Sequence, residues 1–393
     1  VFSQFDVGSE GAILNNSRKN AQTQLAGWVE GNPYLARGEA RVILNEVNSS
    51  DPSRLSGFTE IAGGRAELII ANPAGITCAG CGFINAARTT LTSGQALMDQ
   101  GRLTGFDVSQ GNIRVDGEGL EDRGSDYTQI LAKTTEINAA IYTKNLDVIN
   151  GANTVSYETD AADTVITSNS SATNKATGVA LDVSALGAMY AGKIRLVGTE
   201  KGMGVTNAGS IIASNVGGLQ LDNSGNLINS GSLIANKGKV AINTDGNAVT
   251  NSGTIASSQS TATLASSMLN NSGVINSYDT ASLEQTGAIT NSGEIAVGSF
   301  DIKAAGINNS GKLLQTGSGQ LSVTTKSLVN QQGGIIGQDL YADANTPPVT
   351  APTTTPPTTA NNGSTVQENN TTPNPSEPVP TPLAPIIRNG TIN

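Results

Sequence analysis

A short unit that recurs between residues 205 and 313 constrains the fold of this chain more than any other feature. The unit reads apolar, any residue, Asn, Ser, Gly, any residue, apolar, with Ala in place of Ser in the first copy. Successive copies start 18 to 22 residues apart, and a nearly fixed period of this size indicates a stacked architecture. The copies begin at Val205, Leu227, Val249, Leu269, Ile289 and Ile307, and a blurred copy begins at Leu328.

The residue types in the unit favour strands over helices. Asn and Gly tolerate the left-handed backbone of tight corners, and alternate apolar positions point to one face of a strand. The apolar runs are short, whereas a helical repeat would need helix-length apolar spacing. We therefore predict an all-β parallel β-helix of roughly fourteen or fifteen coils over residues 40–340. The asparagines of successive units should stack as a ladder, and they are Asn207, Asn229, Asn251, Asn271, Asn291 and Asn309.

Composition excludes several classes of site. The 393 residues include no histidine, and the net charge is −10. The chain therefore lacks the commonest metal ligand and general base, and we expect neither a metal site nor a cofactor. Proteins that bind phosphate backbones need a basic face, so neither nucleic acid nor an anionic membrane surface is an expected partner. No run reaches the roughly 18 apolar residues of a membrane span.

A polysaccharide-active β-helix enzyme is the main alternative to a non-catalytic role. Such an enzyme would need clustered carboxylates or a basic catalytic residue on one face. The acids here are sparse, and we expect no catalytic residue. One acidic segment, residues 116–128, fits no calcium-loop spacing; a calcium loop and a solvated excursion both stay open, and we favour the excursion. Its acids are Asp116, Glu118, Glu121, Asp122 and Asp126.

Cys78 and Cys81 are the only cysteines and form a C-x-x-C pair. A zinc site would lack two ligands. A redox-active pair usually opens a helix in a thioredoxin-like unit, whereas this pair lies in a strand–turn–strand context. We favour a structural disulfide that closes a small loop in an oxidising compartment. Two unpaired buried cysteines and a redox pair remain as alternatives.

The two ends of the chain differ from its middle. Near the N-terminus, Trp28 is the only tryptophan, and we expect it to plug one end of the core. The chain begins abruptly at Val1, which we interpret as a mature or trimmed terminus. Residues 345–385 are rich in Pro, Thr and Asn, which predicts a disordered linker. Apolar residues return over 386–393, which we interpret as the start of a truncated following region.

Five blocks occur in order along the first 200 residues. They are Phe2-Ser3-Gln4-Phe5-Asp6-Val7, Ile13-Leu14-Asn15-Asn16-Ser17, Asn32-Pro33-Tyr34-Leu35, Asn72-Pro73-Ala74-Gly75-Ile76 and Leu181 to Glu200. Together they resemble the N-terminal secretion domain of two-partner secretion exoproteins of the filamentous haemagglutinin and contact-dependent growth inhibition (CdiA-like) family. The resemblance covers residues 1–215, and residues 205–344 resemble the start of the fibrous shaft of such proteins. Tyr34 and Ala74 replace an Asn of the family's Asn-Pro-Asn-Leu and Asn-Pro-Asn-Gly-Ile motifs.

The resemblance implies a right-handed parallel β-helix with an N-terminal cap and extra-helical hairpins. It also implies a monomer, exported by a Gram-negative bacterium to the cell surface or medium, whose partner is an outer-membrane TpsB/CdiB-type transporter with periplasmic POTRA domains. A segment that is itself an adhesin for glycans or proteins is the alternative function, and target-cell receptors would be bound by regions outside this chain. The residues implied in recognition and secretion are Phe2, Phe5, Asn32, Pro33, Leu35, Asn72, Pro73, Gly75 and Ile76.

Overall fold

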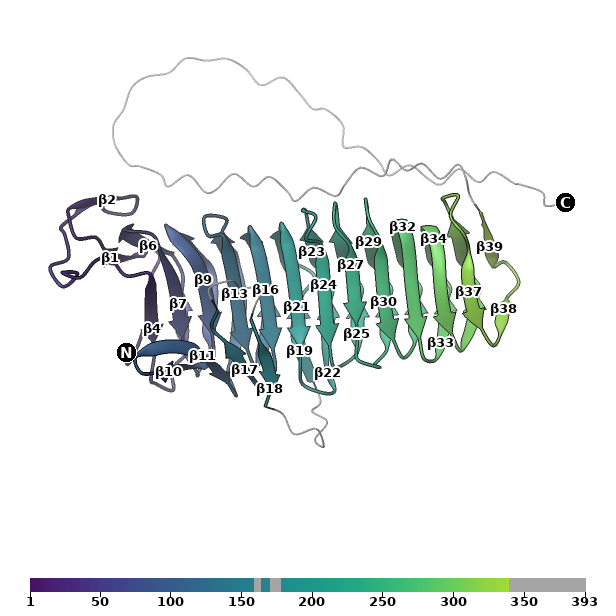
Figure 1. The fold of residues 1–393 in the computed structure, drawn as a ribbon, viewed down its shortest axis with the longest axis horizontal. Coiled ribbons are helices and arrows are strands. Elements are labelled where there is room, and N and C mark those ends of the chain that lie inside the picture. The colour runs from purple at the N-terminus through teal and green to yellow at the C-terminus, as the bar shows by residue number, and fades with distance from the viewer. Residues whose placement is uncertain (159–163, 170–177, 339–393) are drawn as a thin grey trace, which may run out of the picture. The chain divides into compact units, whose positions relative to one another are not determined.

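The computed structural model describes residues 1–158, 164–169 and 178–338. The linker predicted for residues 345–385 and the region predicted for 386–393 lie outside the described residues. Most of the described chain is a parallel β-solenoid of about 13 turns, which confirms the predicted all-β parallel β-helix (Figure 1). There are fewer turns than predicted because two segments leave the solenoid to form strands β10, β11, β17 and β18 of a separate sheet.

Each coil contributes one strand, or part of one, to each of three faces, and strands of successive coils pair in parallel along each face. The first face holds β5 (Ser53–Leu55), β8 (Ile76–Ile84), β12 (Asn112–Asp122), β14 (Thr134–Ile137), β19 (Gly178–Val183), β22 (Met203–Asn207), β25 (Leu227–Asn229), β28 (Val249–Asn251), β31 (Leu269–Asn271), β33 (Ala288–Asn291), β35 (Gly306–Asn309) and β38 (Leu328–Asn330).

The second face also takes the distal halves of the long strands β8 and β12, which bend around a corner. Its other strands are β1 (Ala12–Asn16), β6 (Phe58–Gly63), β15 (Ala140–Thr143), β20 (Ala188–Ala191), β23 (Ser210–Ala213), β26 (Ser232–Ala235), β29 (Thr254–Ser257), β32 (Val274–Gln285), β34 (Glu294–Ala304), β36 (Lys312–Gln315) and β39 (Ile335–Gln338).

The third face takes the distal halves of β32 and β34 in the same way. Its other strands are β4 (Val42–Glu46), β7 (Ala66–Ala71), β9 (Ala86–Thr92), β13 (Tyr127–Ala132), β16 (Asn145–Asn150), β21 (Lys193–Gly198), β24 (Leu219–Asn223), β27 (Val240–Asn243), β30 (Ala262–Ser266) and β37 (Ser322–Thr325). Apolar side chains from all three faces point inward and form one continuous core along the coils.

A cap closes the N-terminal end of the solenoid. Residues before β1 bridge to the first coil in parallel, Phe2 to Val47 and Val7 to Leu55. The hairpin of β2 (Ala21–Thr23) and β3 (Gly27–Val29) follows β1. The prediction that Trp28 plugs the core is wrong, because this side chain is 71% exposed. Smaller side chains, which include Phe5 and Leu14, pack against the end of the core instead.

A four-stranded antiparallel sheet lies outside the solenoid. It consists of β10 (Gln95–Asp99), β11 (Arg102–Val108), β17 (Asn153–Ser156) and β18 (Ile166–Ser168). Phe106, Val108 and Val155 of this sheet form a second apolar cluster with outward-facing residues of the third face, such as Ile69 and Leu131. The excursions are therefore packed structural elements on one side of the first half of the solenoid.

Candidate functional site

Asn72-Pro73-Ala74-Gly75 forms the corner between the third and the first face at the start of the solenoid. The Gly75 amide donates to the Asn72 carbonyl oxygen at 2.9 Å, which closes a β-turn. The Asn72 side chain is fully buried and caps this turn, because its Oδ1 accepts the Ala74 amide at 3.0 Å. Its Nδ2 donates to the Asp51 carbonyl oxygen at 2.9 Å and to Ser53 Oγ at 3.0 Å in the preceding coil. The Asn72 side chain thus fixes its own corner and joins this corner to the preceding coil.

The sequence of this turn matches its geometry. Pro is favoured at the second position of a type I turn, Asn at the first and Gly at the fourth. Gly75 has φ +116°, and a Cβ atom there would lie 2.6 Å from the Asn112 carbonyl oxygen, so only Gly fits. Ala74 does not have a positive φ. The third position therefore does not require the Asn of the family motif, and Ile76 follows as a buried residue of the next strand.

Asn32-Pro33-Tyr34-Leu35 repeats the same device within the cap. The Leu35 amide donates to the Asn32 carbonyl oxygen at 3.3 Å, and Asn32 Oδ1 accepts the Tyr34 amide at 3.0 Å. Asn32 Nδ2 donates to the Asn15 carbonyl oxygen of β1 at 3.1 Å. The two Asn-Pro turns therefore contact different elements. The turn at Asn32 is joined to β1, and the turn at Asn72 is joined to the segment Asp51–Ser53.

Phe2 and Phe5 lie at the edge of the cap, with their ring centroids 5.4 Å apart. Phe2 is 41% exposed, and its backbone exchanges hydrogen bonds with Glu46 and Asn48. Phe5 is half-buried against the core. Both residues therefore help to close the first coil. Phe5 does so by packing its ring against the core, and Phe2 does so mainly through its backbone hydrogen bonds.

Cys78 and Cys81 are joined by a disulfide inside β8, where this strand bends from the first to the second face around Gly80. Strand registers place Cys78 in one column with Val115, Ile137, Val183 and then Asn207. The disulfide therefore closes the corner that Asn-Ser-Gly turns close in the shaft. Both sulfur-bearing side chains are buried, and no third Cys, Asp or Glu in the described chain completes a metal-binding cluster with them.

Replacing both cysteines with serine should lower the free energy of unfolding by about 2 kcal/mol, because the four-residue ring no longer restricts the unfolded chain. Urea unfolding followed by circular dichroism would measure this loss, and a reductant should produce the same loss in the unmodified protein. As a control, Cys78→Val with Cys81→Leu installs the residues that the next coil has at these positions, Val115 and Leu120. This variant should not respond to reductant; mass spectrometry that finds free thiols in periplasmically made protein would contradict the disulfide.

The asparagines of the repeat form a continuous ladder of amides at the corner between the first and second faces. Each Nδ2 donates to the Oδ1 of the next asparagine at 2.7 to 2.8 Å, from Asn207 to Asn330. Up to Asn309, each Nδ2 also donates to the carbonyl oxygen of the glycine two residues later, for example Asn251 to Gly253 at 3.2 Å. These glycines stack so closely that a Cβ atom on Gly253 would lie 2.0 Å from the Gly231 carbonyl oxygen. Asn330 extends the ladder beyond the six predicted residues.

A buried carboxyl group lies where we expected a solvated excursion. Residues 112–122 form β12 within the solenoid, so that prediction is wrong. Asp122 is fully buried and accepts hydrogen bonds from Ser125 Oγ and, at 2.7 Å, from Thr128 Oγ1. Thr89 Oγ1 lies 3.1 Å from Ser125 Oγ. Burial raises the pKa of Asp122 to about 7, against the opposing effect of these hydroxyl groups.

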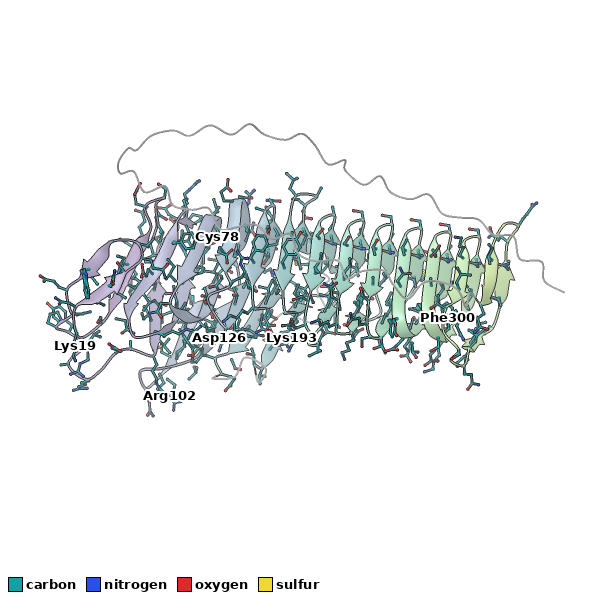
Figure 2. The ribbon with its side chains drawn as sticks, turned by 90° about the horizontal axis from the view of Figure 1, so that it is seen from above. Lys19, Cys78, Arg102, Asp126, Lys193 and Phe300 are labelled. Atoms are coloured by element: carbon teal, nitrogen blue, oxygen red, sulfur yellow. A yellow bond between two sulfur atoms is a disulfide. The ribbon has the colours of Figure 1, made fainter. Side chains whose placement is uncertain are left out.

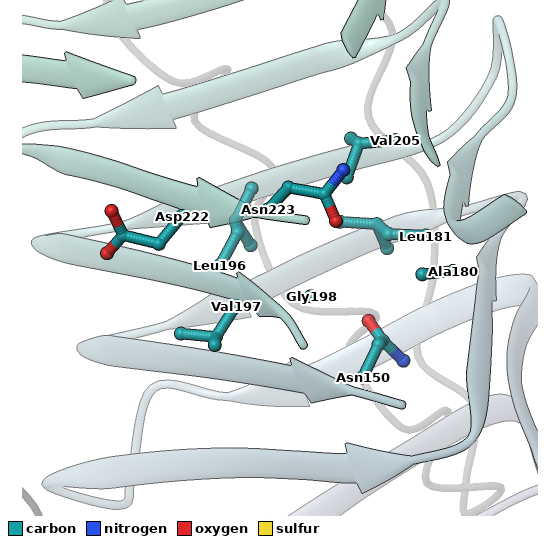
Figure 3. Close-up of a pocket in the computed structure, with 9 residues that line it drawn as sticks. All are labelled: Asn150, Ala180, Leu181, Leu196, Val197, Gly198, Val205, Asp222 and Asn223. Carbon is teal, nitrogen blue, oxygen red and sulfur yellow. The ribbon is translucent and has the colours of Figure 1, made fainter. Parts of the chain in front are cut away.

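A small hollow between coils offers no ligand site (Figure 3). It lies inside the solenoid between β16, β19, β21, β22 and β24 and is too narrow for a water molecule. Asn150 and Asn223 border it, and their side chains are used structurally: Asn150 Nδ2 donates to Thr135 Oγ1 at 2.7 Å and Asn223 Nδ2 to the Met203 carbonyl oxygen at 3.2 Å. The hollow is a packing gap rather than an active site.

The protein is a capped parallel β-solenoid with an outer sheet. The Asn72 side chain, the Cys78–Cys81 disulfide and the asparagine ladder stabilise its corners. The family model of the TPS secretion domain matches residues 1–229, more than half of the chain. The chain belongs to the TPS (two-partner secretion) secretion domain family. No helix that could cross a membrane occurs in the described part of the chain.

Curated relatives are much longer than this chain. It is 51% identical over 255 residues to "Toxin CdiA" of Yersinia pestis, and the aligned residues are 65% of this chain and 8% of that protein. It is 36% identical over 349 residues to "tRNA nuclease CdiA" of Escherichia coli (strain STEC_O31), and the alignment covers 78% of this chain and 10% of that protein. A crystal structure of the filamentous hemagglutinin secretion domain is similar with a TM-score of 0.49 and 25% identity, covering 86% of this chain and 87% of that one.

Proposed function

We propose that this chain is the N-terminal secretion domain of a large exoprotein and has no catalytic role of its own. In this proposal an outer-membrane partner transporter recognises the chain in the periplasm through its POTRA domains. The exported chain then folds at the cell surface, starting from its first coils. Membership of the secretion domain family supports the export role, and the long CdiA relatives support a larger parent protein.

The observation that carries the folding part of the proposal is the buried side chain of Asn72. A solenoid grows by adding coils to a formed end, since each coil contacts only its neighbours. The first coils have no long stack before them, so the corner at Asn72 depends on its own turn and on the coil directly before it. Asn72 stabilises this corner by capping its own turn and binding the preceding coil at Asp51 and Ser53.

Secretion of the Asn72→Ala variant through the partner transporter should fall strongly. The substitution removes the donor to the Asp51 carbonyl oxygen and to Ser53 Oγ, and it leaves the buried Ser53 Oγ unsatisfied, which costs about 1 to 3 kcal/mol. Asn72→Asp retains the oxygen that accepts the Ala74 amide, and so should keep the turn but lose the contact between coils. Immunoblots of medium and periplasm would measure export of each variant.

The matched control is Asn270→Ala, because this asparagine is exposed on a shaft strand. It should be secreted like the unmodified chain. Secretion of Asn72→Ala at the unmodified level would remove the support for a nucleating role of this corner. Secretion of the unmodified chain without any partner transporter would overturn the proposed export route itself.

A further inference from the structure

Two large aromatic side chains point into solvent at the N-terminal tip of the solenoid. Trp28 is 71% exposed and Tyr34 is 93% exposed. Tryptophan is highly buried on average in soluble proteins. Trp28 lies on β3 opposite Gln22 of β2, and Tyr34 lies in the Asn32-Pro33 turn. Neither side chain contributes to the core, so the fold does not account for them.

The backbone that carries these aromatics is firmly held. The buried carboxylate of Glu60 in β6 accepts the Gln24 amide at 2.8 and 2.9 Å and the Leu25 amide at 2.9 Å, which fixes the β2–β3 hairpin onto the solenoid. The Asn32 amide donates to the Ser17 carbonyl oxygen at 2.7 Å, which fixes the turn below Tyr34. The aromatic side chains are therefore displayed on an ordered platform.

Three exposed basic side chains belong to the same tip. Arg18 and Lys19 follow β1, and Gly31 lies against them, since a Cβ atom on Gly31 would be 2.7 Å from the Arg18 carbonyl oxygen. Arg37 follows the turn that carries Tyr34. Figure 2 shows Lys19 at the N-terminal extremity of the solenoid. Within the described residues, none of the three lies within ion-pair distance of a carboxylate.

The tip is less acidic than the rest of the molecule. Residues 11–41 contain four basic residues and two acidic ones, and the carboxylates of Glu10 and Glu60 adjoin them, whereas the whole chain has a net charge of −10. Charges farther apart than a Debye length, about 8 Å at physiological ionic strength, are largely screened. Attraction to an anionic surface therefore comes from the exposed cations Arg18, Lys19 and Arg37 themselves.

We propose that this tip, defined by Arg18, Lys19, Trp28, Tyr34 and Arg37, binds an anionic lipid surface and holds the solenoid end-on against it. Indole and phenol rings favour the headgroup region of a membrane, and exposed Lys and Arg are attracted to anionic headgroups. Residues 42–204, which contain 18 acidic and 12 basic residues, are repelled by the same surface, and this repulsion selects the end-on orientation. The sequence alone argues against an anionic membrane surface as a partner, because the cations are few and are separated along the chain.

The single tryptophan makes the proposal directly measurable, because selectively excited tryptophan fluorescence of the full 393-residue chain reports only on Trp28. Vesicles of phosphatidylglycerol mixed with phosphatidylcholine should shift the Trp28 emission to shorter wavelength, and brominated acyl chains should quench it. Vesicles of phosphatidylcholine alone should do neither. Vesicle flotation would give the partition coefficient, and Trp28→Ala should lower it without unfolding the chain.

Removing the three tip cations with Arg18→Gln, Lys19→Gln and Arg37→Gln should lower partitioning roughly 100-fold, since each cation near the surface contributes about fivefold. The matched control, Lys201→Gln, Lys237→Gln and Lys239→Gln, makes the same change in net charge at exposed shaft lysines and should bind like the unmodified chain. Equal losses in both variants, equal binding to uncharged vesicles, or an unchanged Trp28 emission would overturn the proposal. Binding through Trp28 to a transporter's periplasmic domains but not to vesicles would also overturn it, in favour of a protein partner.

Discussion

Replacing Asn271 with leucine should lower the free energy of unfolding by roughly 3 to 6 kcal/mol. In the ladder, Asn271 Oδ1 accepts from Asn251 Nδ2 at 2.8 Å, and its Nδ2 donates to Asn291 Oδ1 at 2.8 Å and to two carbonyl oxygens, those of Gly273 and Glu294. The substitution removes these four hydrogen bonds and leaves Asn291 Oδ1 without a donor. A hydrogen bond contributes a net of about 0.5 to 1.5 kcal/mol, and an unsatisfied buried group costs about 1 to 3 kcal/mol. Urea unfolding followed by circular dichroism would measure the total loss.

The adjacent residue provides a control of the same type. Asn270 belongs to the same strand, β31, but its side chain points to solvent. Asn270→Leu should change the free energy of unfolding by no more than about 0.5 kcal/mol. Because coils in a solenoid contact only their neighbours, hydrogen exchange should locate the Asn271→Leu defect in β28, β31 and β33. Similar losses for the two variants would show that the ladder does not stabilise the shaft.

The second large effect is a pH dependence that originates from Asp122. Its pKa is about 7 in the folded chain and 3.8 in a solvated reference state. A folded-state pKa above the unfolded value means that the folded protein binds the proton more tightly. The contribution of Asp122 to stability is therefore fully present below pH 3.8 and is lost as the pH rises through 7. The full difference corresponds to roughly 4 kcal/mol.

Asp122→Asn isolates this contribution, because the amide stays neutral at every pH. Relative to this variant, the unmodified protein should become progressively less stable between pH 4 and pH 8 in urea unfolding. Other groups with shifted pKa values, such as Asp126, whose pKa is lowered by hydrogen bonds from Arg65 and Lys144, affect both proteins equally. Parallel stability curves for the two proteins across this range would contradict a buried titrating carboxyl.

The ladder was predictable because the shaft repeats with little variation. A period of 18 to 22 residues brings each asparagine over the previous one, so sequence spacing alone defines the column. The N-terminal coils lack this regularity, because the outer sheet is inserted between consecutive coils. Sequence spacing therefore did not reveal that Cys78 and Asn207 occupy the same column. A signal was present in Cys78-Ala79-Gly80, which parallels Asn207-Ala208-Gly209 at the same corner.

The environment of Asp122 and the exposure of Trp28 could not be predicted from the hydrophobicity of the sequence. The hydroxyl groups around Asp122 come from β9, from the turn after β12 and from β13, so only the strand registers bring them together. Trp28 was expected to plug the core because it is the only tryptophan and lies near the end of the chain, where a cap was expected. The hydrogen bonds to Glu60 instead hold the hairpin in an orientation that leaves the indole outside.

The position of the disulfide has a consequence for the order of events in the proposed export route. Cys78 and Cys81 are three residues apart, so the bond closes a ring within one short segment and connects no distant parts of the chain. A polypeptide with such a ring remains a linear thread and can still be drawn lengthwise through a narrow channel. Oxidation in the periplasm and later passage in an unfolded form are therefore compatible. The corner can be covalently set before any neighbouring coil exists.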